Sequence, residues 1–446
     1  MIKKNKVVHV LRAGKYWLFA PTKREHMHIR TLLNTVYPHK GFVYGQESFT
    51  DEGTRIQVNI RARKNSKPAC AQCGRAGPVY DTQPERRFDM IPVWSLPVDF
   101  VYAMRRVNCP ECGVRVEAVP WGAGKSPMTS AFAHHLASWA RLLSWKEVGQ
   151  RCGASWDTVA RAVSWLVAWG LEHRNLDAIT AIGVDEIQFK KGQKYLTLVY
   201  QIDAGRRRLL WMGKERTMKC FHAFFDMLGP QRCDALAFVC SDMWKPYLKV
   251  IAKRVPDALN ILDRFHIASY LTKAVDDTRR DEVRGLNATG KPAHLHKSRW
   301  VWLKRRSNLT GKQRTHLREL MAINLRTVKA YLFKEQFEHL WTYTSATWAG
   351  KFIDTWCRDV MRHRSLPQLK KVAKTLQTHR PLILNYFKAK TLTKNTFSSG
   401  VVEGFNNKAK LCIRKSYGFR SDKYREIALY HALGNLPEPS LTHRFA

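Results

Sequence analysis

The strongest constraint on the fold is a series of apolar segments between residues 178 and 267, several of which carry an acidic residue at or near the end. Three of them, AITAIGVDEI, KYLTLVYQID and RRRLLWMG, follow one another closely and predict a meander of three strands. Two later segments, ALAFVCSD and ALNILDRFHI, predict buried strands, with helices expected at 217–228 and 244–254. Together these elements predict a mixed sheet.

This order of elements is that of the ribonuclease-H-like fold, in which carboxylates stand at strand ends. The carboxyl ends of parallel strands are also where α/β proteins place ligands. Asp185 follows an apolar run that would bury it, which favours metal ligation over a solvated strand end. Asp242 and Asp263 both end predicted strands, and we favour Asp242 as the second ligand. Glu186 should point to the other face of the sheet and is the weaker candidate.

A late helix, predicted from about Ser399, supplies a third carboxylate. One stripe of this helix is apolar and should face the core: Val402, Phe405, Ala409 and Cys412. One polar face would carry Glu403, Asn406, Asn407, Lys410 and Arg414. Asp185, Asp242 and Glu403 would suffice as protein ligands for two Mg²⁺ or Mn²⁺ ions, the arrangement that phosphodiester cleavage or strand transfer needs. Asn406 would support this site, and phosphates would be held by Lys408, Lys410, Arg414 and Lys415.

The charge of the chain indicates its partner. Lys and Arg number 76 against 36 Asp and Glu, a formal net charge of +40. This excess favours a polyanionic partner, most plausibly nucleic acid, over a basic protein without one. We find no apolar run long enough for a membrane helix and no export signal, so we expect a cytoplasmic, nucleoid-associated protein without a membrane partner.

Ten cysteines without an export signal suggest a reducing compartment, where thiolates bind metal or stay buried as thiols. Four of them form two Cys-x-x-Cys-Gly units, at Cys70 and Cys73 and at Cys109 and Cys112. Two such units at the ends of a short sheet can complete one tetrahedral structural Zn²⁺ site. A pair of redox motifs or chance spacing is the alternative.

From Thr129 the pattern becomes helical, with Phe132, Leu136, Trp139 and Leu143 on one stripe. Ser144 should cap a second short helix, and Ser155 should cap a third that runs to about Trp169. This spacing is typical of a helix-turn-helix, although an ordinary helical hairpin would share it. On the third helix, the outward residues that would contact DNA are Thr158, Arg161 and Ser164.

Collectively, CxxCG, CPxCG, GVDE, SDMWKPY, DRFH and SSGVVEGFNNKAK resemble the zinc-ribbon DDE transposases of bacterial insertion sequences known as the ISL3 family. The resemblance runs from about Met27 to near Leu436. It implies a ribonuclease-H-like core with a helical insertion between the second Asp and the Glu. Asp185, Asp242 and Glu403 match the catalytic triad. Asp263 and His266 match a D-x-x-H element near the active site, although His266 could be a plain strand-end histidine.

The predicted chain is a multidomain α/β protein. Its segments are an extension and lead-in at 1–41, a hairpin and zinc ribbon at 42–128, a helix-turn-helix at 129–175, a first core part at 176–268, an all-α insertion at 269–395 and a last core part at 396–446. The resemblance implies a transposase that binds terminal inverted repeats and target double-stranded DNA as a homodimer or higher assembly. The rival functions are a non-catalytic DNA-binding regulator and a ribonuclease-H-like nuclease without strand transfer.

Overall fold

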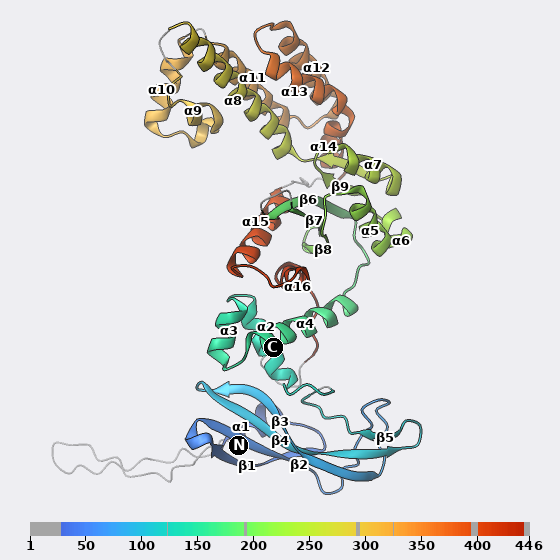
Figure 1. Ribbon diagram of the computed structural model, residues 1–446. Coiled ribbons are helices and arrows are strands. Elements are labelled where there is room, and N and C mark those ends of the chain that lie inside the picture. Colours follow the sequence, from blue (N-terminus) through green and yellow to red (C-terminus); the bar gives the residue numbers. More distant parts are fainter. Residues whose placement is uncertain are drawn as a thin grey trace, which may run out of the picture. The chain divides into compact units, whose positions relative to one another are not determined.

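The computed structural model (Figure 1) describes residues 28–122, 124–190, 194–290, 295–323, 325–393 and 400–440. The predicted extension before Met27 lies outside these residues. The chain divides into two compact units, the first reaching Leu166 and including the end from Pro439, the second spanning Val167–Glu438. Among the described helices, none is both long enough and apolar enough to cross a membrane.

The first unit is built on a five-stranded sheet. Its elements are α1 (Ile29–Val36), β1 (Phe42–Thr50), β2 (Arg55–Ala62), β3 (Val79–Val93), β4 (Leu96–Cys109) and β5 (Gly113–Val116). The strand order is β1-β2-β4-β3, with β5 paired to β4. β1 and β2 are antiparallel and confirm the predicted hairpin. Trp121, Phe88 and Phe100 are buried in the core of this unit.

Side-chain caps define the three helices that follow, α2 (Ser130–Ala140), α3 (Trp145–Cys152) and α4 (Trp156–His173). Ser144 forms a capping box with Glu147, and Ser155 Oγ accepts from the backbone N–H of Thr158, so both predicted caps are confirmed. Gly153 ends α3 with φ +64°. Trp139, expected on the buried stripe, is 42% exposed because Ala133, Ala137 and Ala140 complete the buried face instead.

The second unit contains another five-stranded sheet, made of β6 (Ala181–Lys190), β7 (Lys194–Gln201), β8 (Arg208–Gly213), β9 (Phe238–Ser241) and β10 (Leu259–Leu262). The order is β10-β9-β6-β7-β8. β6, β7 and β8 form an antiparallel meander, whereas β9 is parallel to both β6 and β10. The predicted meander and mixed sheet are therefore confirmed.

Helices cover both faces of this sheet. Val184, Val199 and Val239 share a buried cluster with side chains of α5 (Met218–Leu228) and α7 (Lys245–Arg254); the short α6 (Pro230–Asp234) follows α5. On the opposite face lies α15 (Gly400–Lys415), followed by α16 (Asp422–Leu433). A Cβ added at Gly183 would lie 2.4 Å from Val402 Cγ2, so α15 sits directly on β6.

A helical insertion separates β10 from α15. Its helices are α8 (Arg264–Ala288), α9 (Arg299–Leu303), α10 (Gly311–Met321), α11 (Arg326–Glu338), α12 (Ala346–Arg362), α13 (Pro367–Thr378) and α14 (Arg380–Thr393). Thr310 is the N-cap of α10 and forms a capping box with Gln313. Asn385 Nδ2 on α14 donates to Asn260 O on β10 at 2.9 Å, so the insertion ends beside the strand from which it began.

The close contact between β6 and α15 generates a stability prediction. Gly183→Ala should destabilise the second unit by about 1–3 kcal/mol, because the new methyl group overlaps Val402. Val402→Ala should relieve this overlap, so the double variant should be more stable than the sum of the two single losses allows. Urea unfolding of the four proteins measures the coupling. Additive losses would contradict the packing described here.

His39 should make the first unit sensitive to acid. It is buried between Tyr37 and Trp121, and neither ring nitrogen has a hydrogen-bond partner among the residues that the structure describes. Burial lowers the pKa of His39 from 6.5 to about 4. Below pH 6.5 the unfolded chain therefore binds a proton that the folded chain does not, and stability falls as the pH drops toward 4.

We expect this histidine to contribute a loss of about 2–3 kcal/mol between pH 6.5 and pH 4. Urea unfolding at several pH values, on the wild type and on His39→Phe, checks it. Subtracting the unfolding free energies of His39→Phe from those of the wild type at each pH removes the contribution of every other titrating group. Parallel pH profiles of the two proteins would show that His39 is not the sensitive group.

Candidate active site and cysteine centre

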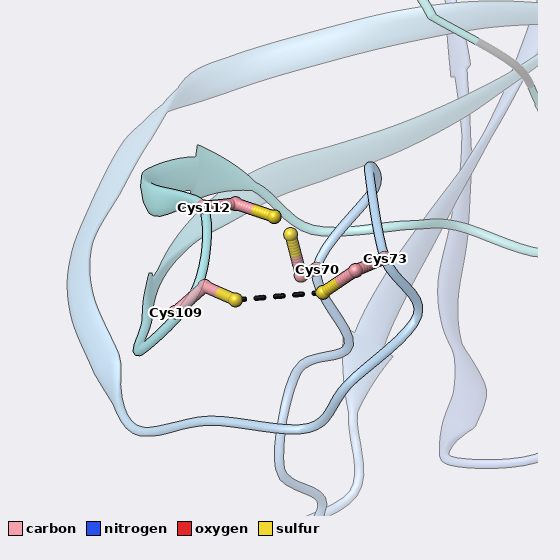
Figure 2. A group of neighbouring side chains, drawn as sticks. All are labelled: Cys70, Cys73, Cys109 and Cys112. Carbon is pink, nitrogen blue, oxygen red and sulfur yellow. Dashed lines mark hydrogen bonds between the residues drawn. The ribbon is translucent and has the colours of Figure 1, made fainter.

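Four cysteine side chains from two loops point toward a common centre (Figure 2). Their Sγ atoms all lie within 4.8 Å of one another, and the Sγ atoms of Cys73 and Cys109 are 3.5 Å apart. Gly74 and Gly113, which follow the second cysteine of each pair, have φ of +74° and +69°. Because glycine adopts this left-handed conformation without strain, each loop can turn tightly enough to present both thiols.

The geometry of this cluster suits a metal ion. Four thiolates at about 2.3 Å from a tetrahedral zinc ion would lie roughly 3.8 Å apart. Backbone N–H groups of Cys112 and Glu111 lower the pKa of Cys109 to about 7, which favours the ligating thiolate. Within the described part of the chain, this is the one group of three or more His, Cys, Asp or Glu whose ligand atoms all lie so close together.

The predicted DNA-contacting residues of α4 differ in exposure. Arg161 is exposed, and its guanidinium donates to Thr158 Oγ1 at 3.2 Å. Thr158 and Ser164 are half-buried, and Ser164 Oγ donates to Ala160 O at 2.6 Å. Of the three residues predicted to contact DNA, Arg161 is the most exposed, and local hydrogen bonds engage the hydroxyls of Thr158 and Ser164.

Three carboxylates gather at one edge of the second sheet. Asp185 lies on β6, Asp242 follows β9 directly, and Asp263 follows β10. The parallel register pairs Gly183 with Cys240 and Ser241 with Leu262, which aligns the three acids across neighbouring strands. Burial raises the pKa of Asp185, and repulsion from Asp263 and Asp242 adds to this effect, against the attraction of His266.

A hydrogen-bond chain ties α15 to Asp185. Asn406 Nδ2 donates to Asp185 Oδ2 at 2.7 Å, and the hydroxyl of Tyr200 donates to Asn406 Oδ1 at 2.8 Å. Asn406 is buried, whereas Glu403 and Lys410 on the same predicted polar face are exposed. The reason is physical: the Asp185 carboxylate and the Tyr200 hydroxyl satisfy both ends of the amide inside the protein.

Glu403 stands one helical turn before Asn406 and is exposed. Its neighbour Val402 packs on Gly183, two residues before Asp185. Among the described residues, the carboxylate oxygens of Glu403, Asp185 and Asp242 do not all lie within 4.8 Å of one another. Of the cations expected near phosphates, the exposed ones are Lys408, Lys410 and Arg414, and Lys415 is half-buried.

Arg216 is a site residue that the sequence analysis missed. Its Nε donates to Glu186 Oε1 at 2.9 Å and its Nη2 to Asp242 Oδ2 at 3.3 Å, while the guanidinium lies 4.4 Å from the ring centroid of Trp244. Burial and the charge of Asp242 raise the pKa of Glu186 to about 7. Arg216 belongs to an aperiodic loop between β8 and α5, and no sequence pattern marks it.

Asp263 and His266 lie at the start of α8. The Asp263 carboxylate accepts from the backbone N–H of Phe265 at 2.7 Å and caps the helix. His266 Nε2 is 3.9 Å from Asp263 Oδ2. The expectation that His266 ends a strand is wrong, because β10 stops at Leu262 and the cap begins a helix immediately.

Comparisons with known proteins agree with this architecture. The profile of a transposase family, the ISL3 type of DDE transposase, matches residues 182–428, more than half of the chain. The chain is 28% identical over 402 residues to transposases for insertion sequence element IS1557 of Mycobacterium tuberculosis, covering 84% of this chain and 88% of theirs. It is 27% identical over 360 residues to the IS1001 transposase of Bordetella parapertussis, covering 80% and 86%. With its carboxylate edge inside the matched segment, this chain belongs to the ISL3 family of insertion-sequence DDE transposases.

Proposed function

We propose that this transposase binds the terminal inverted repeats of its own insertion sequence and cuts and joins DNA ends with Mg²⁺ or Mn²⁺. One observation carries the proposal: Asp185 on β6 and Asp242 directly after β9 are aligned across two neighbouring parallel strands, and Asn406 ties the helix of Glu403 to Asp185. The strand order, with three antiparallel strands followed by two parallel ones, supports a ribonuclease-H-like core.

Asp185, Asp242 and Glu403 would hold the divalent ions, with Asp263 and His266 in support. Carboxylates kept close together despite their mutual repulsion fit a divalent cation, because its charge would relieve the repulsion that contributes to the raised pKa of Asp185. When bound, two such ions would supply activation of the attacking oxygen and stabilisation of the leaving oxygen. The exposed position of Glu403 leaves its carboxylate free to turn toward the edge.

The protein itself contributes positioning and charge. Water would attack the phosphodiester at a repeat end, and the freed 3′-hydroxyl would then attack target DNA, without a covalent enzyme intermediate. Asn406 and Tyr200 hold the Asp185 carboxylate in one orientation during both steps. Lys408, Lys410 and Arg414 project from the same helix and would bind phosphates beside Glu403.

The first unit would recognise the repeats. In a helix-turn-helix, the N-terminal part of the second helix contacts base edges in the major groove. Arg161 lies in this part of α4, exposed, with its guanidinium oriented by Thr158. The zinc ribbon formed by the four cysteines would stabilise the β-sheet of this unit. We propose a homodimer or higher assembly on DNA, since two repeat ends must be joined to one target.

Two other functions compete. A non-catalytic regulator would need only the first unit, and it leaves the three aligned acids at the sheet edge without a role. A nuclease without strand transfer would share the whole site. The joined product, rather than the nick, distinguishes the nuclease from a transposase.

Removal of one carboxylate at a time tests the catalytic assignment. Asp185→Asn, Asp242→Asn and Glu403→Gln should each abolish cleavage and joining while repeat binding stays intact, because the amide keeps the shape but loses the ligating charge. Asp263→Asn should reduce activity less. Gel assays with labelled repeat ends of the element and a target plasmid in Mg²⁺ measure both steps.

Asp257→Asn is the matched control, since it removes one exposed negative charge from the same unit away from the sheet edge formed by the three acids. It should cut and join like the wild type. Joining by Glu403→Gln at the wild-type rate would require another acid to complete the site.

Zinc removal tests the cysteine centre. Metal analysis should find about one zinc per chain, and Cys109→Ser should lose it and destabilise the first unit, since a structural zinc contributes folding energy directly. Cys152→Ser changes a half-buried cysteine outside the cluster and should keep the metal. Zinc-free wild-type protein that still folds and binds repeats would disprove the assignment.

A further inference from the structure

A cavity of about 860 Å³ lies beside the carboxylate edge of the second unit. Four of its lining residues are cations, Lys190, Lys214, Arg216 and Arg425, and two are aromatic, Phe189 and Tyr195. We call it the basic cavity. None of these residues was a candidate site residue in the sequence analysis, and the proposed chemistry does not use them.

Two cations of the basic cavity are ion-paired arginines and two are exposed lysines, of which Lys214 lies close enough to Glu426 to lower the pKa of that carboxyl against the effect of burial. Arg425 is paired with Asp422 at 2.8 Å, and Arg216 is paired with Glu186 at 2.9 Å. Lys190 and Lys214 are both exposed at the wall. Glu215 is the other acid in the lining, so the wall as a whole carries four positive and two negative charges. This balance favours an anion.

A ring of the cavity wall orients Arg425, whereas Arg216 lies closer to Trp244, at 4.4 Å from its ring centroid, than to Tyr195 of the wall. The Arg425 guanidinium lies 3.9 Å from the centroid of Phe189, and the Arg216 guanidinium lies 6.0 Å from that of Tyr195. Guanidinium groups stacked on rings are oriented before any ligand binds. Flat aromatic and guanidinium surfaces above a cationic wall are the features with which proteins bind single-stranded nucleic acid.

Arg216 connects the basic cavity to the catalytic edge. It lines the cavity, and its Nη2 also lies 3.3 Å from Asp242 Oδ2. A ligand whose reacting phosphate sits at the carboxylates therefore enters the cavity as soon as it continues past Asp242. A small free anion is too short to contact both the carboxylate edge and the basic cavity, whereas a polymer of phosphodiesters can contact both.

We propose that the basic cavity binds the DNA strand adjacent to the phosphodiester that is cut or joined, with Lys190 and Lys214 on its phosphates. This inference rests on the proposed function and adds a binding site to it. Two strands have the required chemistry, the flank of the donor DNA beyond the repeat end and the target strand. The experiment separates them.

The test compares two double variants of the full chain. Lys190→Glu/Lys214→Glu reverses both exposed charges of the basic cavity. Lys249→Glu/Lys253→Glu makes the same change at two exposed lysines of α7 that do not line the cavity. Fluorescence anisotropy measures their affinities for three duplexes: a repeat end with flanking DNA, a repeat end terminated at the cut, and a target duplex without a repeat.

The cavity variant should bind one class of DNA roughly tenfold more weakly than the control variant does, and its salt slope on that DNA should fall by about 1–2. A loss on flanked ends alone assigns the donor flank, and a loss on target duplex alone assigns the target strand. Equal affinities of the two variants on all three duplexes, with both proteins folded by circular dichroism, would overturn the proposal.

Failure of the proposed function would look different. If wild-type protein neither cuts nor joins in Mg²⁺, the catalytic assignment fails whatever the cavity binds. If the wild type and the α7 variant cut and join while the cavity variant matches them in every affinity, only the cavity proposal fails.

Discussion

The hydrogen bond from Asn406 Nδ2 to Asp185 Oδ2 joins two residues 221 positions apart and fixes α15 to the sheet. Tyr200 donates to the other end of the amide, so Asn406 has one orientation in which both partners are satisfied. Because Gly183 has no side chain, α15 can approach β6 closely enough for this bond to form. A buried amide used in this way specifies position more than it adds stability, since a slip by one residue would leave both partners unpaired.

This bond places a condition on the whole helical insertion. The chain must leave the sheet after β10, pass through the helices α8 to α14 and return to the same place. The structure meets the condition through contacts near the two ends of the insertion. Arg264, at the start of α8, donates to the Tyr386 hydroxyl on α14 at 3.1 Å, and Asn385 donates to the backbone of β10. These two contacts bring the first and last helices of the insertion together beside β10.

Features encoded by neighbouring residues could be predicted from the sequence. The caps Ser144, Ser155 and Thr310 are local, and each Cys-x-x-Cys-Gly contains the glycine that its turn requires. The strand meander followed from apolar runs of strand length. By contrast, the burial of Asn406 depends on Asp185 and Tyr200, and helical periodicity places a polar residue on the exposed face unless such a partner is known.

Arg216 could not be predicted for a related reason. Asp185 and Glu186 point to opposite faces of β6, as alternation requires, so Glu186 alone has no link to the catalytic edge. Arg216 creates that link by bonding Glu186 on one side and Asp242 on the other. The shorter bond is to Glu186, whose side chain is 7% exposed, and the longer one is to Asp242. Glu186 thus anchors the guanidinium on the face away from α15. Both oxygens of Asp242 accept hydrogen bonds, Oδ2 from Arg216 and Oδ1 from the backbone N–H of Trp244 at 2.9 Å, so the Asp242 carboxylate is held in one orientation at the edge where Asp185 lies.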